Sequence, residues 1–420
     1  MTSVEAAESW PDDPVDRIGR VLIVAPQPFY EDRGTPIAVA QLAAALSDLG
    51  AEIDLLTYPV GSNISIQRLR IVRCRNPVSY RSVPIGFSLR KLVLDLCMLP
   101  TLASLIRSGN YDIVHAVEEM ALPALVFCRS RGVPVIYDMQ SSLPDQLRTH
   151  SVFRLRPAQS LMRWIERWMV RRADAIICSA GLLDHVKSVD GGARAREWLF
   201  AGQAPGDSAG ERALTRAELD LDTDAQLVVY SGTFEPYQGL DMLVAAIPRV
   251  LDAFPKAVFL LIGASPENLL ADREIAMRMI QQGNLRILPR QRREVVPSYL
   301  ALADVLVSPR AYGDNVPLKI FDYMVSGTPI VATDIHGHRS VLSKETAVLV
   351  ANTSVAIAAG IMSLLRDPAL AARFARQALN ASGRSQDRKS FSETVRALYL
   401  EAKGRSRNEL SKRGSGSAVE

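Results

Sequence analysis

Short apolar runs alternate with longer helical patterns from residue 20 onward, and this alternation limits the possible folds more than any other feature of the chain. The first run, VLIVAPQ at 21–27, is predicted to be a buried strand, and PIAVAQLAAALSDLG at 36–50 a helix with Thr35 as its N-cap. Unbroken apolar strands separated by helices are typical of a parallel sheet covered on both faces. The sequence therefore predicts an α/β fold.

The alternation stops in a polar, glycine-marked stretch and then restarts, which divides the chain into two halves. A chain of 420 residues also exceeds the usual size of a single core. Ligands of doubly wound sheets bind beyond the carboxyl ends of the strands, so we expect a cleft between the halves. The predicted organisation is a disordered N-terminus at 1–17, a first Rossmann-like domain at 18–195, a linker at 196–225, a second Rossmann-like domain at 226–385, a last helix at 386–404 and a disordered tail at 405–420.

Composition and charge exclude several classes of function. The chain has 49 basic and 45 acidic residues, a net charge of +4, and no long basic block, so no nucleic-acid partner is predicted. Its 4 scattered cysteines include no CxxC pair and are expected to be buried thiols in a reducing compartment. The acidic start does not resemble a signal peptide, and the apolar stretch at 92–106 is too short to cross a bilayer. We expect a cytoplasmic protein, with peripheral membrane contact left open.

Motifs for a dinucleotide, for ATP and for a metal are each missing or misplaced. The stretch after the first strand, APQPFYEDRGTPI, has one glycine where the dinucleotide fingerprint needs three, and no G-x-x-x-x-G-K-[ST] occurs. The Asp-x-Asp pattern in DLDTD at 220–224 precedes a strand, so it lies at the end of the sheet away from the expected cleft. We therefore predict no cofactor and no catalytic metal.

Polar side chains follow two neighbouring strands of the first half. They suit hydrogen bonds to a polyol, but they would serve equally well as structural or turn residues, and both interpretations stay open. The candidates are Glu118 and Asp138 as catalytic residues, and His115, Glu119, Gln140 and Ser141 on the acceptor side.

The segment SPRAYGDNVPLKIFDYM at 308–324 contains two carboxylates, Asp314 and Asp322, on either side of a helix start predicted at Pro317. Free N–H groups at that start, together with the Lys319 ammonium, suit a phosphate. The offset between the two acids corresponds to roughly 12 Å if helical, about the length of a nucleotide sugar from ribose to hexose. The alternative is that both are turn and surface residues. The donor-binding candidates here are Arg310, Asn315, Val316, Pro317, Leu318, Lys319 and Asp322, with Asp314 as a third catalytic candidate.

At this point a family resemblance becomes apparent. From about residue 20 to 403 the chain resembles a retaining glycosyltransferase of family 4, with the GT-B fold of two Rossmann-like domains facing a cleft; VVYSGTFEPYQGLDMLVAAIPRVL, YLALADVLVSPR and PLKIFDYMVSGTPIVATD carry the resemblance. It implies that a hexose moves from a nucleotide diphosphate sugar to an acceptor hydroxyl with retention, without a metal or a stable covalent intermediate. It further implies that Asp322 holds the ribose and Asp314 the transferred sugar, each where the family has glutamate, and that the helix containing 391–404 crosses back to the first domain.

Other positions match the family only in part. Many relatives carry an arginine and a lysine on the diphosphate where this chain has GTFEPYQG. Thr233 or Phe234, and Gln238, stand at those positions, so Arg310 and Lys319 are expected to supply the charge; Gly232 is a further donor-binding candidate. Gly34 and Thr35 resemble the family's small-residue loop near the phosphate. Two alternatives remain: a nucleotide-sugar epimerase on the same fold, and a non-catalytic GT-B subunit of an active partner.

The acceptor is expected to be a small molecule or a lipid-linked saccharide. PAQSLMRWIERWMVRR at 157–172 is predicted to form a helix with Leu161, Trp164, Ile165, Trp168 and Met169 on one face and arginines beside it. One interpretation packs this face on the first sheet with the arginines in solvent. The other places the basic, tryptophan-bearing segment on anionic lipid.

Overall fold

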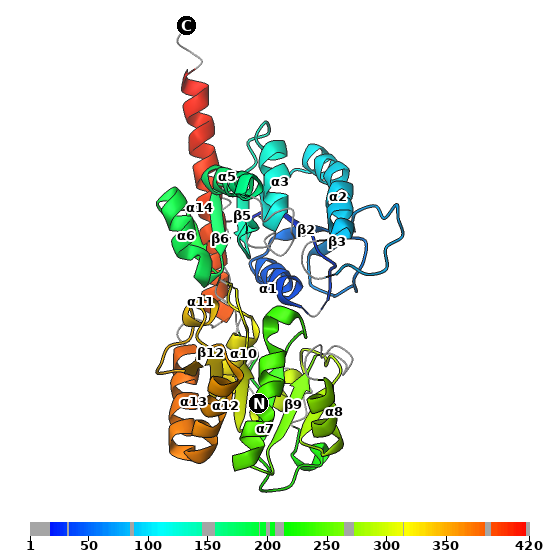
Figure 1. Cartoon of the computed structure of the whole chain (residues 1–420). Helices are drawn as coiled ribbons and strands as arrows, with labels where there is room; N and C mark the ends of the chain where they lie inside the picture. Colours follow the sequence, from blue (N-terminus) through cyan, green and yellow to red (C-terminus); the bar gives the residue numbers. More distant parts are fainter. Residues whose placement is uncertain are drawn as a thin grey trace, which may run out of the picture.

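The computed structural model describes residues 17–31, 33–84, 88–144, 156–192, 194–198, 202–205, 214–263, 273–313, 315–382 and 388–416. Within them the chain forms two parallel sheets, each covered by helices on both faces, and the domains lie end to end (Figure 1). The predicted α/β fold of two doubly wound domains is confirmed. Residues 1–16 of the N-terminal tail predicted at 1–17, and Asp314, lie outside the described residues.

The first sheet has seven parallel strands. Their order is β3 (Leu69–Arg73), β2 (Glu52–Thr57), β1 (Arg20–Val24), β4 (Ile113–Val117), β5 (Val135–Met139), β6 (Ala175–Cys178) and β7 (Ala195–Glu197). β7 pairs with β6 and thus extends the sheet past residue 195, where the sequence analysis ended the first domain. This short strand has polar neighbours and therefore forms no apolar run in the sequence.

Alternate residues of β1 face opposite layers of helices, because successive side chains of a strand point to opposite faces. Val21 and Ile23 pack in one cluster with α1 (Gly34–Asp48) and the last helix, α14 (Arg388–Gly416). Leu22 and Val24 pack in another with the helices of the far face. These are α2 (Leu89–Ser108), α3 (Ala121–Cys128), α5 (Arg156–Arg172) and α6 (Leu183–Asp190).

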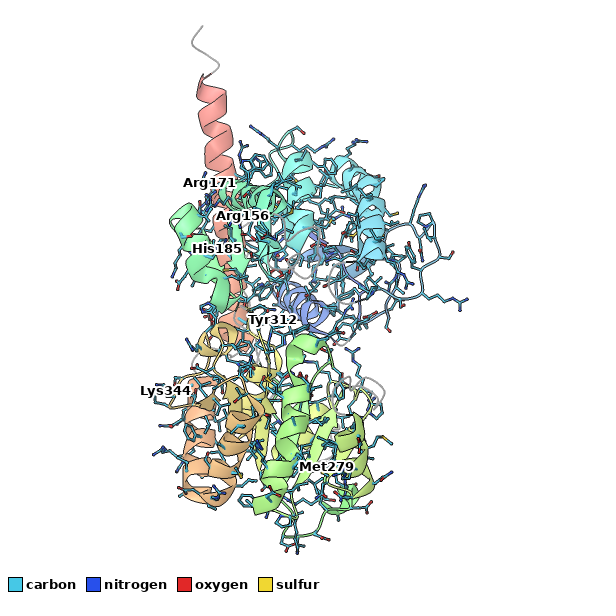
Figure 2. The ribbon with its side chains drawn as sticks, in the orientation of Figure 1. Arg156, Arg171, His185, Met279, Tyr312 and Lys344 are labelled. Atoms are coloured by element: carbon cyan, nitrogen blue, oxygen red, sulfur yellow. The ribbon has the colours of Figure 1, made fainter. Side chains whose placement is uncertain are left out.

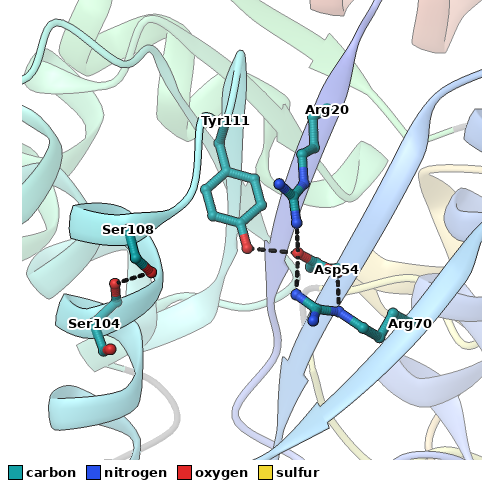
Figure 3. A network of polar contacts seen from close by, with 6 residues as sticks. All are labelled: Arg20, Asp54, Arg70, Ser104, Ser108 and Tyr111. Carbon is teal, nitrogen blue, oxygen red and sulfur yellow. Dashed lines mark hydrogen bonds and ion pairs between the residues drawn. The ribbon is translucent and has the colours of Figure 1, made fainter.

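A buried carboxylate ties four segments of the first sheet together (Figure 3). Asp54 on β2 accepts hydrogen bonds from Arg20 of β1 at 2.9 Å, from Arg70 of β3 at 2.6 and 2.7 Å, and from the Tyr111 hydroxyl before β4 at 2.6 Å. Burial alone would raise the pKa of Asp54, but the bonds from Arg70, Tyr111 and Arg20 outweigh it and hold the pKa below its usual value.

The second sheet has six parallel strands in the order β10 (Leu285–Leu288), β9 (Val258–Ile262), β8 (Leu227–Ser231), β11 (Val305–Ser308), β12 (Ile330–Thr333) and β13 (Val348–Val350). On one face it packs against α7 (Leu240–Ala253), α8 (Arg273–Gln281) and α12 (Ser354–Arg366). On the other lie α9 (Val296–Leu302) and α10 (Lys319–Val325), and α13 (Pro368–Ser382) packs against α10. The short helix α11 (His336–Arg339) contacts the first domain, where His336 Nε2 lies 2.9 Å from the Gly181 carbonyl oxygen.

The last helix, α14, leaves the second domain and lies along the first, beside α1 and β6 (Figure 1). Tyr399 lies 2.8 Å from His115 Nδ1, and Arg196 donates to Glu401 at 2.8 Å. The tail predicted to be disordered from residue 405 is corrected, because α14 continues to Gly416 and the Ser406 hydroxyl donates to the Gly132 carbonyl at 2.9 Å.

Among the described residues, no single helix is long and apolar enough to cross a membrane; only the bent pair of α12 and α13 reaches that length and composition jointly.

Candidate functional site

A cleft of about 450 Å³ lies between the two domains. Val117, Ser231 and Ile262, the last residues of β4, β8 and β9, all line it, so it lies beyond the carboxyl ends of both sheets as expected for doubly wound folds. Its described lining includes two carboxyl groups, those of Glu118 and Asp322. It includes six basic side chains, those of Arg33, Lys91, Arg290, Arg293, Arg310 and Lys319. This balance favours an anionic ligand.

The segment before α10 differs from its prediction. α10 begins at Lys319 rather than Pro317 and has only 7 residues. The Val316 N–H is already paired, since it donates at 3.0 Å to the hydroxyl of Ser179 in the first domain. The Val316 N–H is therefore not available to a phosphate, and the site predicted around the N–H groups of Asn315 and Leu318 stays a prediction.

Lys319 supplies such a charge. Its ammonium donates to Gln238 Oε1 at 3.1 Å and lies over the Tyr230 ring, 3.9 Å from the centroid. Burial, and next the nearby Arg310, lower the pKa of Lys319 well below its usual value. Because burial disfavours the charged form of this amine, an anion bound beside Lys319 would stabilise that form.

Glycine is required beside this ammonium. Gly232, at the end of β8, has φ +148°, and a Cβ there would collide with the Lys319 side chain. Thr233 follows and accepts a 2.6 Å hydrogen bond from the Tyr230 hydroxyl through its carbonyl oxygen. Gly232, Thr233 and Gln238 all line the cleft, as do Asn315, Pro317 and Leu318.

Arg310 organises the loop that leads to α10. Its guanidinium donates to the Tyr312 carbonyl at 3.0 Å and to Asn315 Oδ1 at 2.6 Å, and it lies 5.2 Å from the Tyr237 ring centroid. Arg310 therefore forms hydrogen bonds with residues before and after position 314. Its predicted role as a donor-binding cation stays a prediction, because these loop contacts already use part of its hydrogen-bonding capacity.

Asp322 lies one helical turn after Lys319 on the same side of α10. It accepts a 2.9 Å hydrogen bond from the Gln203 N–H of the linker, and Arg293 lies 3.4 Å away. Burial raises the pKa of Asp322, while Arg293 and the Gln203 bond act in the opposite direction. Only 14% of its side chain is exposed, so it is neither a turn former nor a solvated surface residue.

Glu118 is the described carboxyl group on the first-domain wall of the cleft. It has φ +53°, in the left-handed region that side chains other than glycine seldom adopt, and it accepts a 2.9 Å hydrogen bond from the Ser141 hydroxyl. Burial, with the Glu119 charge next in size, raises the pKa of Glu118 well above its usual value. Gln140 and Ser141 also line the cleft.

Three residues that were predicted as catalytic or acceptor-side candidates form contacts within the first domain or with α14 instead. His115 is fully buried between Asp138 Oδ2 at 3.3 Å and the Tyr399 hydroxyl of α14, and Asp138 also accepts from Trp198 Nε1 at 2.6 Å. Glu119 forms a 2.7 Å ion pair with Lys91. None of His115, Asp138 and Glu119 lines the cleft as described. For His115 the sequence could not reveal this, because its partner Tyr399 lies on α14, at the other end of the chain.

Gly34 and Thr35 lie at the start of α1 and line the cleft. The predicted N-cap is corrected: α1 begins at Gly34, and Arg33 occupies the cap position without a side-chain capping bond. A Cβ added to Gly34 would meet no atom within 4 Å, so the space before this helix is open.

Four cationic residues of the lining were not predicted from the sequence, namely Arg33, Lys91, Arg290 and Arg293. A signal was available for two of them, because PRQRRE directly follows the strand β10, at the end where ligands bind. Arg33 also precedes the small residues Gly34 and Thr35. Burial lowers the pKa of Arg33, and the nearby Glu31 partly offsets the effect.

The Asp-x-Asp segment lies away from this cleft, before β8, where Asp224 pairs with Lys256. The described residues contain no group of three or more histidine, cysteine or acidic side chains that could hold a metal ion.

Comparison with known proteins places this arrangement in a family. Residues 33–197 match the model of a glycosyl transferase 4-like domain, and residues 225–367 match that of the glycosyl transferases group 1. The two matches fall on the two domains in the expected order. The chain belongs to the family 4, or group 1, GT-B glycosyltransferases.

Relatives of this glycosyltransferase differ in activity. A glycogen synthase of Mycobacterium tuberculosis is 25% identical over 342 residues, which span 78% of this chain and 75% of that protein. A phosphatidyl-myo-inositol mannosyltransferase of Mycolicibacterium smegmatis is 25% identical over 370 residues, 86% of this chain and 88% of that protein. The structure of Anabaena HepE in complex with UDP superposes with a TM-score of 0.68 at 14% identity, over 90% of this chain and 98% of that one.

Proposed function

We propose that this glycosyltransferase moves a hexose from a nucleoside diphosphate sugar to an acceptor hydroxyl, with retention of anomeric configuration. The observation that carries the proposal is the pairing of Lys319 and Asp322 on one side of α10, inside a cleft with six basic side chains. A nucleoside diphosphate carries its phosphates next to its ribose hydroxyls, so a cation and a carboxylate one turn apart match it. The UDP bound to HepE supports uracil as the base.

In this proposal each wall of the cleft has its own task. Lys319, with the other cations of the lining, stabilises the diphosphate as it leaves, and Asp322 holds the ribose. Asp314, by its family resemblance, holds the transferred sugar. Glu118, Gln140 and Ser141 on the first-domain wall face the acceptor, while a phosphate oxygen of the donor takes the acceptor proton. The protein contributes positioning and charge stabilisation, and we expect no metal.

The proposal is tested by incubating the protein with a panel of nucleotide sugars and following the anomeric protons by NMR. Slow donor hydrolysis, with a first-formed sugar of the donor's configuration, supports retaining transfer, and Asp322→Asn should weaken it. An inverted first product would refute retention. Conversion of the donor to an isomer would indicate an epimerase, and the absence of any donor binding would indicate a non-catalytic subunit.

A further inference from the structure

Three helices of the first domain form one outward surface. α2, α3 and α5 cover the same face of the first sheet, and α3 packs against both of the others (Figure 1). The described part of the chain exposes twelve large apolar side chains, and seven of them lie on these helices. Those seven, with their exposed fractions, are Leu89 76%, Leu92 44%, Leu96 58%, Leu122 37%, Val126 54%, Leu161 52% and Trp164 63%. We call this the three-helix surface.

α5 does not pack on the sheet with its whole predicted apolar face. Met169 is buried, and Ile165 and Trp168 pack against the core, as the first interpretation required. Leu161 and Trp164, one turn earlier, point outward with more than half of each side chain exposed. An exposed tryptophan beside exposed leucines is unfavourable in water unless something covers it.

The exposed charge of this surface has a single sign. α2 and α5 expose the arginines Arg90, Arg107, Arg156, Arg163, Arg167, Arg171 and Arg172, of which Figure 2 labels Arg156 and Arg171. The three helices contain only two acids, and neither is available at the surface. Asp95 accepts a hydrogen bond from Tyr58, and Glu166 is buried against His185 and the Leu143 N–H.

We propose that the three-helix surface docks on a lipid bilayer that carries anionic headgroups. Leucine and tryptophan side chains insert at the boundary between headgroups and acyl chains, and arginines beside them bind lipid phosphates. Charge complementarity selects this occupant over a second copy of the chain, because a symmetric contact would bring two sets of arginines together without an acid to neutralise them.

The docked surface leads to the acceptor side of the cleft. Lys91 lines the cleft, and its neighbours Leu89 and Leu92 belong to the three-helix surface. A docked protein therefore places the first-domain wall of the cleft next to the lipid headgroups. Resting on the proposed function, this assigns the acceptor to a lipid-linked class whose hydroxyl reaches Glu118 from the membrane.

The test is co-sedimentation of the whole chain with vesicles of phosphatidylcholine alone or with about a third phosphatidylglycerol, at low and moderate salt. No donor is added, so the outcome does not depend on transferase activity. We expect binding to the anionic vesicles that weakens as salt rises, and much weaker binding to the neutral ones. Failure to bind anionic vesicles at low salt would overturn the proposal and leave the proposed transfer intact.

Two sets of variants separate the apolar and the basic contributions. Leu161→Ser with Trp164→Ser should lower vesicle affinity about tenfold. Arg163→Gln with Arg167→Gln and Arg171→Gln should lower it by about fivefold per charge, or on the order of a hundredfold in all. The matched controls lie on α13 of the second domain, where Leu379→Ser and Arg376→Gln alter an exposed leucine and an exposed arginine.

Every altered side chain is exposed, so we expect unchanged melting temperatures. This result would establish that the variants remain folded. Binding that the controls weaken as much as the first-domain variants would contradict the proposal. So would a dimer in the absence of lipid that the same first-domain variants dissociate, because the surface would then belong to a second copy of the chain.

Discussion

Replacing Lys319 by methionine should separate nucleotide binding from stability. Methionine keeps the length of the apolar stem and removes the ammonium that bonds to Gln238 at 3.1 Å and lies over Tyr230. A hydrogen bond from a charged donor contributes about 1.5–3 kcal/mol. At about 1.4 kcal/mol per tenfold, Lys319→Met should weaken binding of a nucleoside diphosphate roughly 10- to 150-fold.

Stability should respond differently to the same substitution. Folding lowers the pKa of Lys319, so the folded state binds its proton less tightly than the unfolded state. The wild type therefore loses stability as the pH falls from the unfolded pKa of Lys319 through its folded pKa. Lys319→Met removes this loss, which offsets the bond to Gln238 that it also removes. We expect a melting temperature within a few degrees of wild type at neutral pH.

Isothermal titration calorimetry with nucleoside diphosphates checks this prediction. In the wild type, an anion at Lys319 favours its charged form, so binding should take up protons and weaken as pH rises, and Lys319→Met should abolish that uptake. The matched control is Lys344→Met, which removes an exposed lysine of the same domain (Figure 2). Equal affinities of wild type and Lys319→Met, or an equal loss in Lys344→Met, would refute the assignment of Lys319 to the diphosphate.

The remaining predictions concern other acids and one serine. In steady-state kinetics, Asp322→Asn should chiefly raise the donor KM about ten- to a hundredfold, because ribose contacts change little during transfer. Asp314→Asn should chiefly lower kcat, by about the same factor. If both variants behave like the wild type, the assignment of these acids to the donor site is wrong. Transferase activity should survive treatment with EDTA and the substitution Asp222→Ala. A loss of activity in EDTA that manganese restores would contradict this prediction. Asp54→Asn should lower the free energy of unfolding by about 2 kcal/mol at pH 7 in urea titrations. That loss should shrink as the pH falls through the lowered pKa of Asp54, and a constant loss would disprove its ionic origin. Ser179→Ala removes the 3.0 Å hydrogen bond from the Val316 N–H, which joins the two domains and contributes about 1 kcal/mol. The ligand-free protein should then show a larger radius of gyration in X-ray scattering. An unchanged radius would rule out Ser179 as a contact that closes the cleft.

The fold could be predicted from the sequence because apolar strands and amphipathic helices are encoded locally. The strand predicted at 21–27 overlaps β1, whereas β7 was missed because three residues among polar neighbours give no periodic signal. The helical end of the chain was also missed: residues after 404 look polar, and Arg405 and Ser406 are ordered by contacts with Asp174 and Gly132 that no local pattern encodes.

The site was predictable where one segment carries it. Lys319 and Asp322 share α10, so their spacing shows them on one side of a helix. Glu118 and Asp138 end neighbouring strands with similar patterns, yet one lines the cleft and the other is buried against Trp198. That difference depends on Trp198, which lies 60 residues farther along the chain and is brought to Asp138 by tertiary packing.

In the proposed function, the interdomain cleft binds a nucleoside diphosphate through Lys319 and Asp322. Calorimetric titration of the wild type and of the double variant Lys319→Met/Asp322→Asn with UDP, GDP and ADP tests it most directly. We expect the wild type to bind at least one of the three nucleotides saturably and one to one, and the double variant to stay folded and lose that binding. Absence of binding by the wild type, or retained affinity in the double variant, would contradict it.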